Sequence, residues 1–215
     1  MDPLIKQANE LLQNQPFEYA FCGGFAIDLF LGFESRKHGD IDIHAYWKDR
    51  DIIIEYMLSL GFNVCEMLGG GKAHRITDIG KQLLVKRNIF CFKDGCELVQ
   101  LSETSQEDVY LINFQHIGQT KLDFIEFLFN SRTDSHFLYA RNHDIRRPLS
   151  KAVLTAGDMP YLAPEICLLY KSTDIQREGY KHDYDMAMSK MTNEQKAWLN
   201  HALASLYPEG HMWIV

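Results

Sequence analysis

The sequence predicts an α+β protein, with a mixed β-sheet domain over residues 1–148 and a small helical domain over residues 149–215. Short segments between residues 17 and 129 have the composition and alternation of strands, and helical segments separate several of them. From Tyr161 onward, apolar residues recur at helical spacing. The segment Arg146-Arg147-Pro148-Leu149 marks the change between the two patterns.

Composition limits the function classes. The chain has 215 residues, of which 46% are hydrophobic, and its net charge of −7 disfavours a long nucleic-acid substrate. No apolar run reaches the ~20 residues that a membrane-spanning helix needs, and the N-terminus lacks a signal sequence. Five scattered cysteines without a Cys-x-x-Cys pair predict a reducing, cytoplasmic compartment. Nothing in the sequence indicates an oligomeric state.

The N-terminal third contains the segment that most strongly suggests a function. A helix is expected over residues 3–13, a strand over 17–22, and a helix over 25–31 that ends at Gly32. Gly23-Gly24, between that strand and helix, offers backbone N–H groups to phosphates. In the alternating stretch Asp40-Ile41-Asp42-Ile43, both carboxylates project from one face of a strand, where a Mg²⁺ ion would relieve their repulsion.

The remaining elements follow from the same patterns. A helix is expected over residues 48–60, and helices are expected to begin at Ala163-Pro164-Glu165 and end at Lys171 and to span 181–191 and 193–207. Lys93-Asp94-Gly95 is expected to close a hairpin. Strands are expected over residues 62–67, 83–92, 97–101, 110–114 and 121–129.

Two stretches resemble a known superfamily. Gly-Gly-Phe-Ala-Ile-Asp-Leu-Phe-Leu-Gly from Gly23 and Arg-Lys-His-Gly-Asp-Ile-Asp-Ile from Arg36 resemble the nucleotidyltransferases typified by DNA polymerase beta. They are most similar to the aminoglycoside 2''-adenylyltransferase and lincosamide nucleotidyltransferase group. The Ala-Pro-Glu helix that ends in Lys171 is similar to that group as well, whereas His182 and Met186 depart from the group's pattern.

The resemblance implies a mixed-sheet nucleotidyltransferase core and a Mg²⁺-dependent reaction. A nucleoside monophosphate, expected to be AMP from ATP, would pass to a hydroxyl group of a small molecule such as an aminoglycoside- or lincosamide-like antibiotic. The implied site comprises two groups of residues. Asp40, Asp42 and Asp123 would hold metal, with Asp123 also the general base, and Gly23, Gly24, Arg36, His38 and Lys171 would bind the nucleotide.

Several of these residues have a second interpretation. Strand alternation places Asp123 and Glu126 on opposite faces, so only one of them is expected to join the acidic pair, and the sequence favours Asp123. Asp28 is interpreted as a surface or helix-pairing residue. Arg36 and His38 can also be solvated loop residues, and Lys171 a partner of the helix dipole. Residues 69–72, Gly-Gly-Gly-Lys, are interpreted as a flexible loop, since the ending of a phosphate loop is missing.

Other function classes also fit parts of the sequence. Asp-x-Asp occurs in haloacid-dehalogenase phosphatases, but the threonine expected after it is absent and the Gly-Gly segment would be unexplained. A retaining glycosyltransferase needs more chain before the motif than the 39 residues that precede Asp40. A non-catalytic nucleotide-binding protein, or transfer to a protein or tRNA acceptor, remains open, as do the nucleotide and the acceptor.

Overall fold

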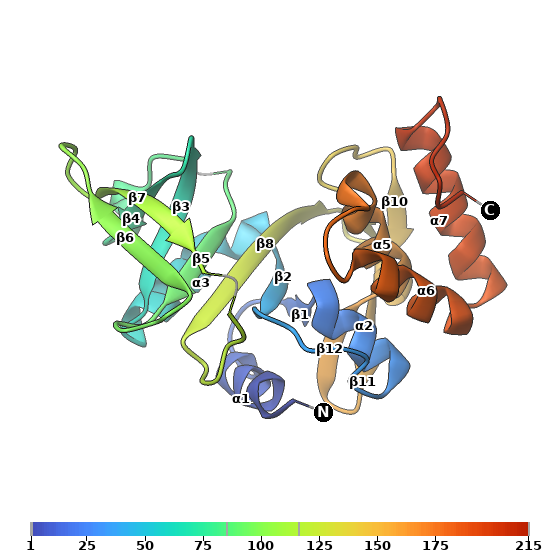
Figure 1. Ribbon diagram of the computed structural model, residues 1–215, viewed down its shortest axis with the longest axis horizontal. Coiled ribbons are helices and arrows are strands. Elements are labelled where there is room, and N and C mark those ends of the chain that lie inside the picture. The colour runs from blue at the N-terminus through green and yellow to red at the C-terminus, as the bar shows by residue number, and fades with distance from the viewer. Residues whose placement is uncertain (1, 85, 116, 215) are drawn as a thin grey trace. The chain divides into compact units, whose positions relative to one another are not determined.

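A computed structural model describes residues 2–84, 86–115 and 117–214 (Figure 1). The chain divides into two compact units. We call the unit formed by Ala20–Lys37 and Ser131–Val215 the helical unit, and the unit formed by Asp2–Tyr19 and His38–Asn130 the sheet unit. This division differs from the expected boundary at Pro148, because an early strand pairs with a late one within the helical unit.

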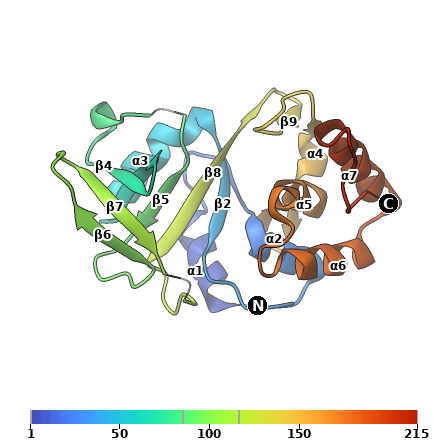
Figure 2. The same ribbon diagram turned by 45° about the horizontal axis from the view of Figure 1, so that its top comes forward.

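The sheet unit is built on one mixed sheet. Strands β2 and β8 are parallel, as Figure 2 shows, and the other neighbouring pairs are antiparallel. The last two residues of β8 belong to the helical unit. The order in the sheet is β2 (Asp42–Tyr46), β8 (Phe124–Arg132), β5 (Ile89–Phe92), β3 (Asn63–Gly69), β4 (Lys72–Ile76), β7 (Val109–Phe114) and β6 (Val99–Glu103).

Two α-helices accompany this sheet, α1 (Pro3–Leu12) and α3 (Arg50–Ser59). Both were expected from helical spacing. The carboxylate of Asp2 accepts a hydrogen bond from the Leu4 N–H at 2.8 Å and so caps α1. Of the five apolar positions predicted for α1, Leu4, Ile5, Ala8 and Leu12 are buried and Leu11 is half-buried.

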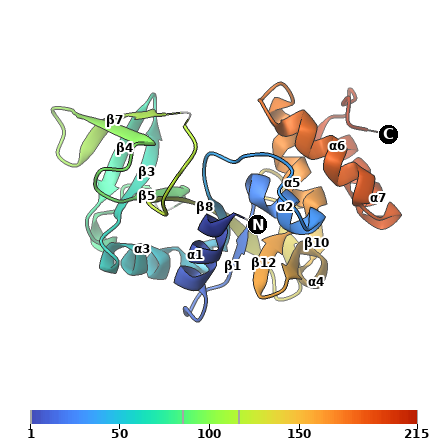
Figure 3. The same ribbon diagram turned by 60° about the horizontal axis from the view of Figure 1, so that its bottom comes forward.

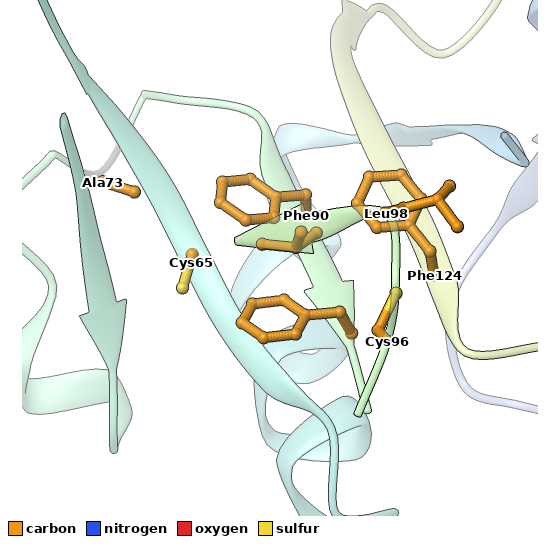
Figure 4. Packing of buried hydrophobic residues seen from close by; sticks show 8 residues of the cluster. Cys65, Ala73, Phe90, Cys96, Leu98 and Phe124 are labelled. Carbon is orange, nitrogen blue, oxygen red and sulfur yellow. The ribbon is translucent and has the colours of Figure 1, made fainter. Parts of the chain in front are cut away.

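The core of the sheet unit is rich in phenylalanine (Figure 4). Phe90 of β5 packs against Phe124 of β8, with 6.3 Å between ring centroids. Full burial of one such side chain contributes about 1.5–3 kcal/mol. The core therefore anchors the start of β8, next to the predicted site residue Asp123. The buried cluster comprises Cys65, Ala73, Phe90, Phe92, Cys96, Leu98, Val99 and Phe124.

Two expectations for the sheet unit were wrong. Residues 83, 84 and 86–88 do not extend β5, which begins at Ile89, and the expected hairpin between β5 and β6 does not form. Residue 85 of the expected strand lies outside the described residues. Both edges of β5 are taken by β3 and β8, whereas β6 pairs with β7. Gly69, Gly70 and Gly71 all have positive φ and form the turn between β3 and β4, a hairpin that strand patterns alone did not predict.

The helical unit combines helices with short strands (Figure 3). The three C-terminal helices match the predicted ones, and α2 packs against α5 and α6. Phe21 of β1 pairs with Tyr161 of β12 in parallel, which the sequence did not predict. The elements are β1 (Tyr19–Phe21), α2 (Gly23–Leu31), β9 (His136–Leu138), β10 (Arg146–Pro148), α4 (Leu149–Ala152), β11 (Val153–Ala156), β12 (Met159–Leu162), α5 (Pro164–Lys171), α6 (Tyr180–Lys190) and α7 (Asn193–Leu206).

Two further properties concern the whole described chain. None of its helices is both long enough and apolar enough to cross a membrane. All five cysteines are buried thiols without a disulfide bond.

Candidate functional site

The predicted acidic pair lies at the start of β2. Asp42 is the first residue of the strand and is half-buried, while Ile41 and Ile43 on either side are fully buried. Alternation along the strand therefore turns the Asp42 carboxylate away from the face that buries the two isoleucines. Asp40, also half-buried, lies in the bend that precedes β2.

Glu126 lies opposite Asp42 on the neighbouring strand. In the parallel ladder of β2 and β8, Asp42 is the Cα partner of Glu126, and the Glu126 N–H donates to the Ile41 carbonyl at 2.9 Å. Paired residues on adjacent strands project from the same face of a sheet. Glu126 therefore projects from the same face of the sheet as Asp42, and both residues are half-buried. The sequence alone could not reveal this pairing.

Asp123 directly precedes β8, which begins at Phe124. Its N–H donates to the Lys121 carbonyl, and its own carbonyl accepts from the Lys93 N–H, each at 2.9 Å. The Asp123 side chain is buried, 3.2 Å from the Lys121 ammonium, and it contacts the Cys96 thiol, whose pKa is raised mainly by burial and further by this carboxylate. The choice of Asp123 over Glu126 as the third acid stays a prediction.

The acids at this edge suit a hard divalent cation. Mg²⁺ binds one or two carboxylates together with phosphate oxygens and water, and so needs no cage made of protein alone. Among residues 2–84, 86–115 and 117–214, no three His, Cys, Asp or Glu side chains already form a metal cage. Asp40 and Asp42 fit the two-carboxylate arrangement, and the third carboxylate can come from Asp123 or Glu126.

The Gly-Gly segment begins helix α2. Gly23 has a φ of 63°, in the left-handed region that glycine adopts without strain. The N-cap residue, Cys22, makes no side-chain capping hydrogen bond. The N–H groups of the first helical turn, which have no partner within a helix, point along the helix axis and favour an anion.

Arg36 and Lys171 come together around a residue that the sequence did not single out. Arg36 donates from Nε and Nη2 to the two carboxylate oxygens of Asp183, at 2.7 and 2.8 Å. Lys171 Nζ lies 3.0 Å from Asp183 Oδ2. The Asp183 side chain is fully buried and that of Lys171 nearly so, whereas a quarter of the Arg36 side chain is exposed. Lys171 is therefore more than a partner of the α5 dipole.

The two cations keep the buried carboxyl group ionised. Burial by itself raises the pKa of Asp183, but the hydrogen bonds and charges of Arg36 and Lys171 outweigh that effect, and its pKa lies below the ordinary value. Two positive groups then share one negative charge. Arginine and lysine are side chains of the kind that binds phosphate.

Gly179 and Tyr180 enclose the same cluster. Gly179 has a φ of 81°, and an added Cβ would lie 2.9 Å from the Arg36 guanidinium. Glycine thus permits both the backbone turn into α6 and the close approach of Arg36. The ring of Tyr180 lies 4.2 Å from Lys171 Nζ, a cation–π contact.

The other predicted residues lie as follows. Asp28 is buried in α2, where its carboxylate accepts hydrogen bonds from the Ser35 N–H and hydroxyl at 2.9 and 2.6 Å, so it is not the surface residue that was expected. His38 is half-buried and belongs to the sheet unit, unlike Arg36. Burial lowers the pKa of His44 to about 3, so this neighbour of Asp42 is neutral at physiological pH.

Comparison with known families gives a match over half of the chain. A model of the aminoglycoside-2''-adenylyltransferase family matches residues 4–111. That span contains Gly23, Gly24, Arg36, Asp40 and Asp42, but not Asp123, Lys171 or Asp183. A comparison with curated proteins gives no significant match.

Solved structures show the same fold. The lincomycin-bound lincosamide antibiotic adenylyltransferase LnuA is 13% identical, with a TM-score of 0.54 and coverage of 89% of this chain and 98% of that one. The aminoglycoside enzyme ANT(2'')-Ia in complex with adenylyl-2''-tobramycin is 14% identical, with a TM-score of 0.54 and coverage of 94% and 97%. At such identities the likeness concerns the fold.

Proposed function

Because the chain belongs to the aminoglycoside-2''-adenylyltransferase family, a family of nucleotidyltransferase enzymes, we propose that it transfers AMP from ATP to a hydroxyl group of a small molecule. The observation that carries this proposal is the acidic edge of β2 and β8, which follows the Gly23-Gly24 helix start in the chain. The first supplies carboxylates for a metal and the second supplies N–H groups for phosphates.

The reaction is a substitution at phosphorus. The acceptor oxygen forms a bond to the α-phosphorus of ATP, the bond from that phosphorus to the β-phosphate oxygen breaks, and pyrophosphate leaves. Asp40 and Asp42 would hold Mg²⁺, together with Asp123 as third ligand. When bound, Mg²⁺ neutralises phosphate charge and stabilises the attacking and leaving oxygens.

The protein's own residues divide the remaining tasks. Asp123 takes the proton of the acceptor hydroxyl as general base. Glu126, which is paired with Asp42, is the alternative residue for this role. The N–H groups of Gly23 and Gly24 donate to the triphosphate. Arg36, His38 and Lys171 balance the charge that develops on the leaving pyrophosphate.

The acceptor is proposed to be an aminoglycoside- or lincosamide-like antibiotic, which would make the enzyme a resistance factor. Of two proteins with the same fold, one is a lincosamide antibiotic adenylyltransferase bound to lincomycin, and the other, ANT(2'')-Ia, is in complex with adenylyl-2''-tobramycin. The five reduced cysteines agree with action in the cytoplasm.

The proposal is tested by a screen of acceptors with labelled ATP, GTP, CTP and UTP in the presence of Mg²⁺. We expect labelled nucleoside monophosphate on one or more hydroxylated antibiotics, with ATP as the preferred donor. The Asp42→Asn variant is the negative control. Transfer of the labelled nucleoside monophosphate only to a protein or tRNA would contradict the proposal of a small-molecule acceptor.

A non-catalytic nucleotide-binding protein is separated by a second measurement. Exchange of labelled pyrophosphate into ATP requires that the bond at the α-phosphorus be broken and remade, and it is measured with the acceptor present. Binding of ATP without any exchange or transfer would show that the scaffold binds nucleotide and has lost catalysis.

A further inference from the structure

Asp183 and Glu194 of the helical unit are each held by two cations, but the Asp183 side chain is fully buried, whereas that of Glu194 is 56% exposed. Arg36 lies 147 residues before Asp183 and Lys171 lies on a different helix, α5. All three side chains meet where the Asp183 carboxylate is fully buried. Such an arrangement restricts both cations to one geometry.

Stability alone does not require this arrangement. A buried ion pair is often no more stabilising than apolar side chains of the same volume, so its presence is weak evidence for a stabilising role. Here a second buried cation adds the cost of desolvating another charge. Two cations on one carboxylate suit the binding of an anion, and Arg36, a quarter exposed, keeps part of its side chain accessible.

The contact between Arg36 and Asp183 is also directional. Nε and Nη2 form a two-pronged contact with the carboxylate, and Nη1 donates to the Lys37 carbonyl at 3.0 Å. A guanidinium fixed through all three nitrogens cannot rotate freely. The absence of a side chain at Gly179 allows the guanidinium to lie against the backbone.

We propose that Asp183 is a positioning residue for the nucleotide triphosphate: it holds Arg36 and Lys171 in the geometry in which they bind the outer phosphates of ATP and the pyrophosphate product. This inference rests on the proposed function. Asp183 itself, an anion, does not contact the phosphates. Its effect passes through the two cations, whose conformational freedom it removes before the nucleotide arrives.

The experiment compares Asp183→Asn with the wild-type protein by calorimetric titration of ATP, pyrophosphate and AMP in the presence of Mg²⁺. We expect binding of ATP and of pyrophosphate to weaken about tenfold or more, and binding of AMP, which lacks the outer phosphates, to change less than about twofold. Asp174→Asn, the same change at an exposed residue just after α5, is the control and should leave all three affinities unchanged.

The sign of the effect is decisive. Removal of a negative charge beside a phosphate site by itself tightens phosphate binding, so tighter ATP binding by Asp183→Asn would show that Asp183 competes with the nucleotide and would overturn the inference. Equal weakening of ATP and AMP, together with a lower melting temperature, would reduce Asp183 to a structural residue and overturn it as well.

A second variant keeps the inference testable if Asp183→Asn does not fold. Arg36→Lys retains the charge but loses the two-pronged contact with Asp183. It should weaken the binding of ATP and pyrophosphate and leave the binding of AMP nearly unchanged. Where both single variants fold, the double variant Arg36→Lys/Asp183→Asn should bind ATP no more weakly than the worse single variant, because both changes break the same contact. Additive losses would contradict this coupling.

Failure of the proposed function itself would look different. A wild-type protein that binds neither ATP nor pyrophosphate would overturn the nucleotidyltransferase assignment and this inference with it. If the wild-type protein turns over normally and Asp183→Asn binds ATP and pyrophosphate with unchanged affinity, only the inference about Asp183 would be overturned.

Discussion

The acids at the edge of β2 and β8 differ from the buried acids of the helical unit in how their charge is balanced. Asp42 and Glu126 are half-buried, and the lysine beside Asp123, Lys121, is itself 62% exposed. In the helical unit, Asp183 and Glu165 are fully buried, and each is held by an arginine through two nitrogens.

The difference follows from the cost of burying charge. A fully buried carboxylate must be compensated by the protein's own groups at all times. A half-buried carboxylate can rely on water and remain available to an incoming cation. A half-buried carboxylate therefore suits a binding edge, and a fully buried carboxylate with its own cation suits a fixed support.

The largest expected effect breaks the acidic edge. Asp42→Asn should lower turnover by about 10³-fold or more, the scale of a lost electrostatic contact in a transition state, while relief of repulsion among acids leaves the melting temperature equal or higher. Steady-state kinetics and thermal unfolding measure both. Glu55→Gln, an exposed acid on α3, should change neither. Wild-type turnover by Asp42→Asn would remove this residue from the metal site.

The next prediction separates Asp123, which precedes β8, from Glu126 within that strand. As the general base, Asp123 should matter most for turnover, so Asp123→Asn is expected to lower kcat by about 10²–10⁴-fold and to keep ATP binding. Glu126→Gln should lower kcat by less than about tenfold. The Mg²⁺ concentration for half-maximal activity should be measured for both variants. If Glu126→Gln lost most of its turnover and Asp123→Asn kept it, Glu126 would be the general base, as its pairing with Asp42 permits.

A third prediction tests the internally balanced acids. Arg147 contacts Glu165 through Nε and Nη2 at 3.1 and 2.7 Å, and Gln195 donates to the other oxygen of Glu165 at 2.8 Å. Arg147→Leu leaves a buried carboxylate without its cation and should cost about 3–5 kcal/mol of unfolding free energy. Arg146→Leu, at the exposed neighbour, should cost less than about 0.5 kcal/mol. Denaturant titration distinguishes the two, and equal costs would contradict the assignment.

The smallest effect concerns pH and separates the two buried acids from each other. Burial raises the pKa of Glu165 above its ordinary 4.5, against the opposing effect of Arg147, whereas two cations hold the pKa of Asp183 below its ordinary 3.8. Asp183 thus adds stability above its unfolded pKa, which is lost as the pH falls through its folded pKa. Glu165 does the reverse, adding stability below 4.5 that is lost as the pH rises through its folded pKa.

Difference curves of unfolding free energy against pH show these signs. The unfolding free energy of the wild-type protein minus that of Asp183→Asn should fall as the pH drops below about 4. The same difference for Glu165→Gln should fall as the pH rises above about 4.5. Curves of the same sign would mean that Arg147 compensates Glu165 as fully as two cations compensate Asp183.

Local patterns were sufficient for several elements of this protein. Helical spacing placed α1, α3, α5, α6 and α7 to within a few residues, and the left-handed glycines Gly23 and Gly32 lie at the predicted ends of α2. These features depend on residues that are near in sequence, and their physical causes, periodicity and backbone freedom, can be read from the sequence itself.

The sequence by itself determined the acidic motif, the glycine pair and the family resemblance, since each is a short run of residues. Tertiary structure decided which side chains meet: the parallel ladder set Glu126 beside Asp42, and the packing of the helical unit brought Asp183 to Arg36. The hairpin expected at residues 93–95 was wrong for the same reason, because the partners of β5 are β3 and β8. Strand register and ion pairing across 147 residues depend on which surfaces the whole fold buries together, and no local pattern encodes that.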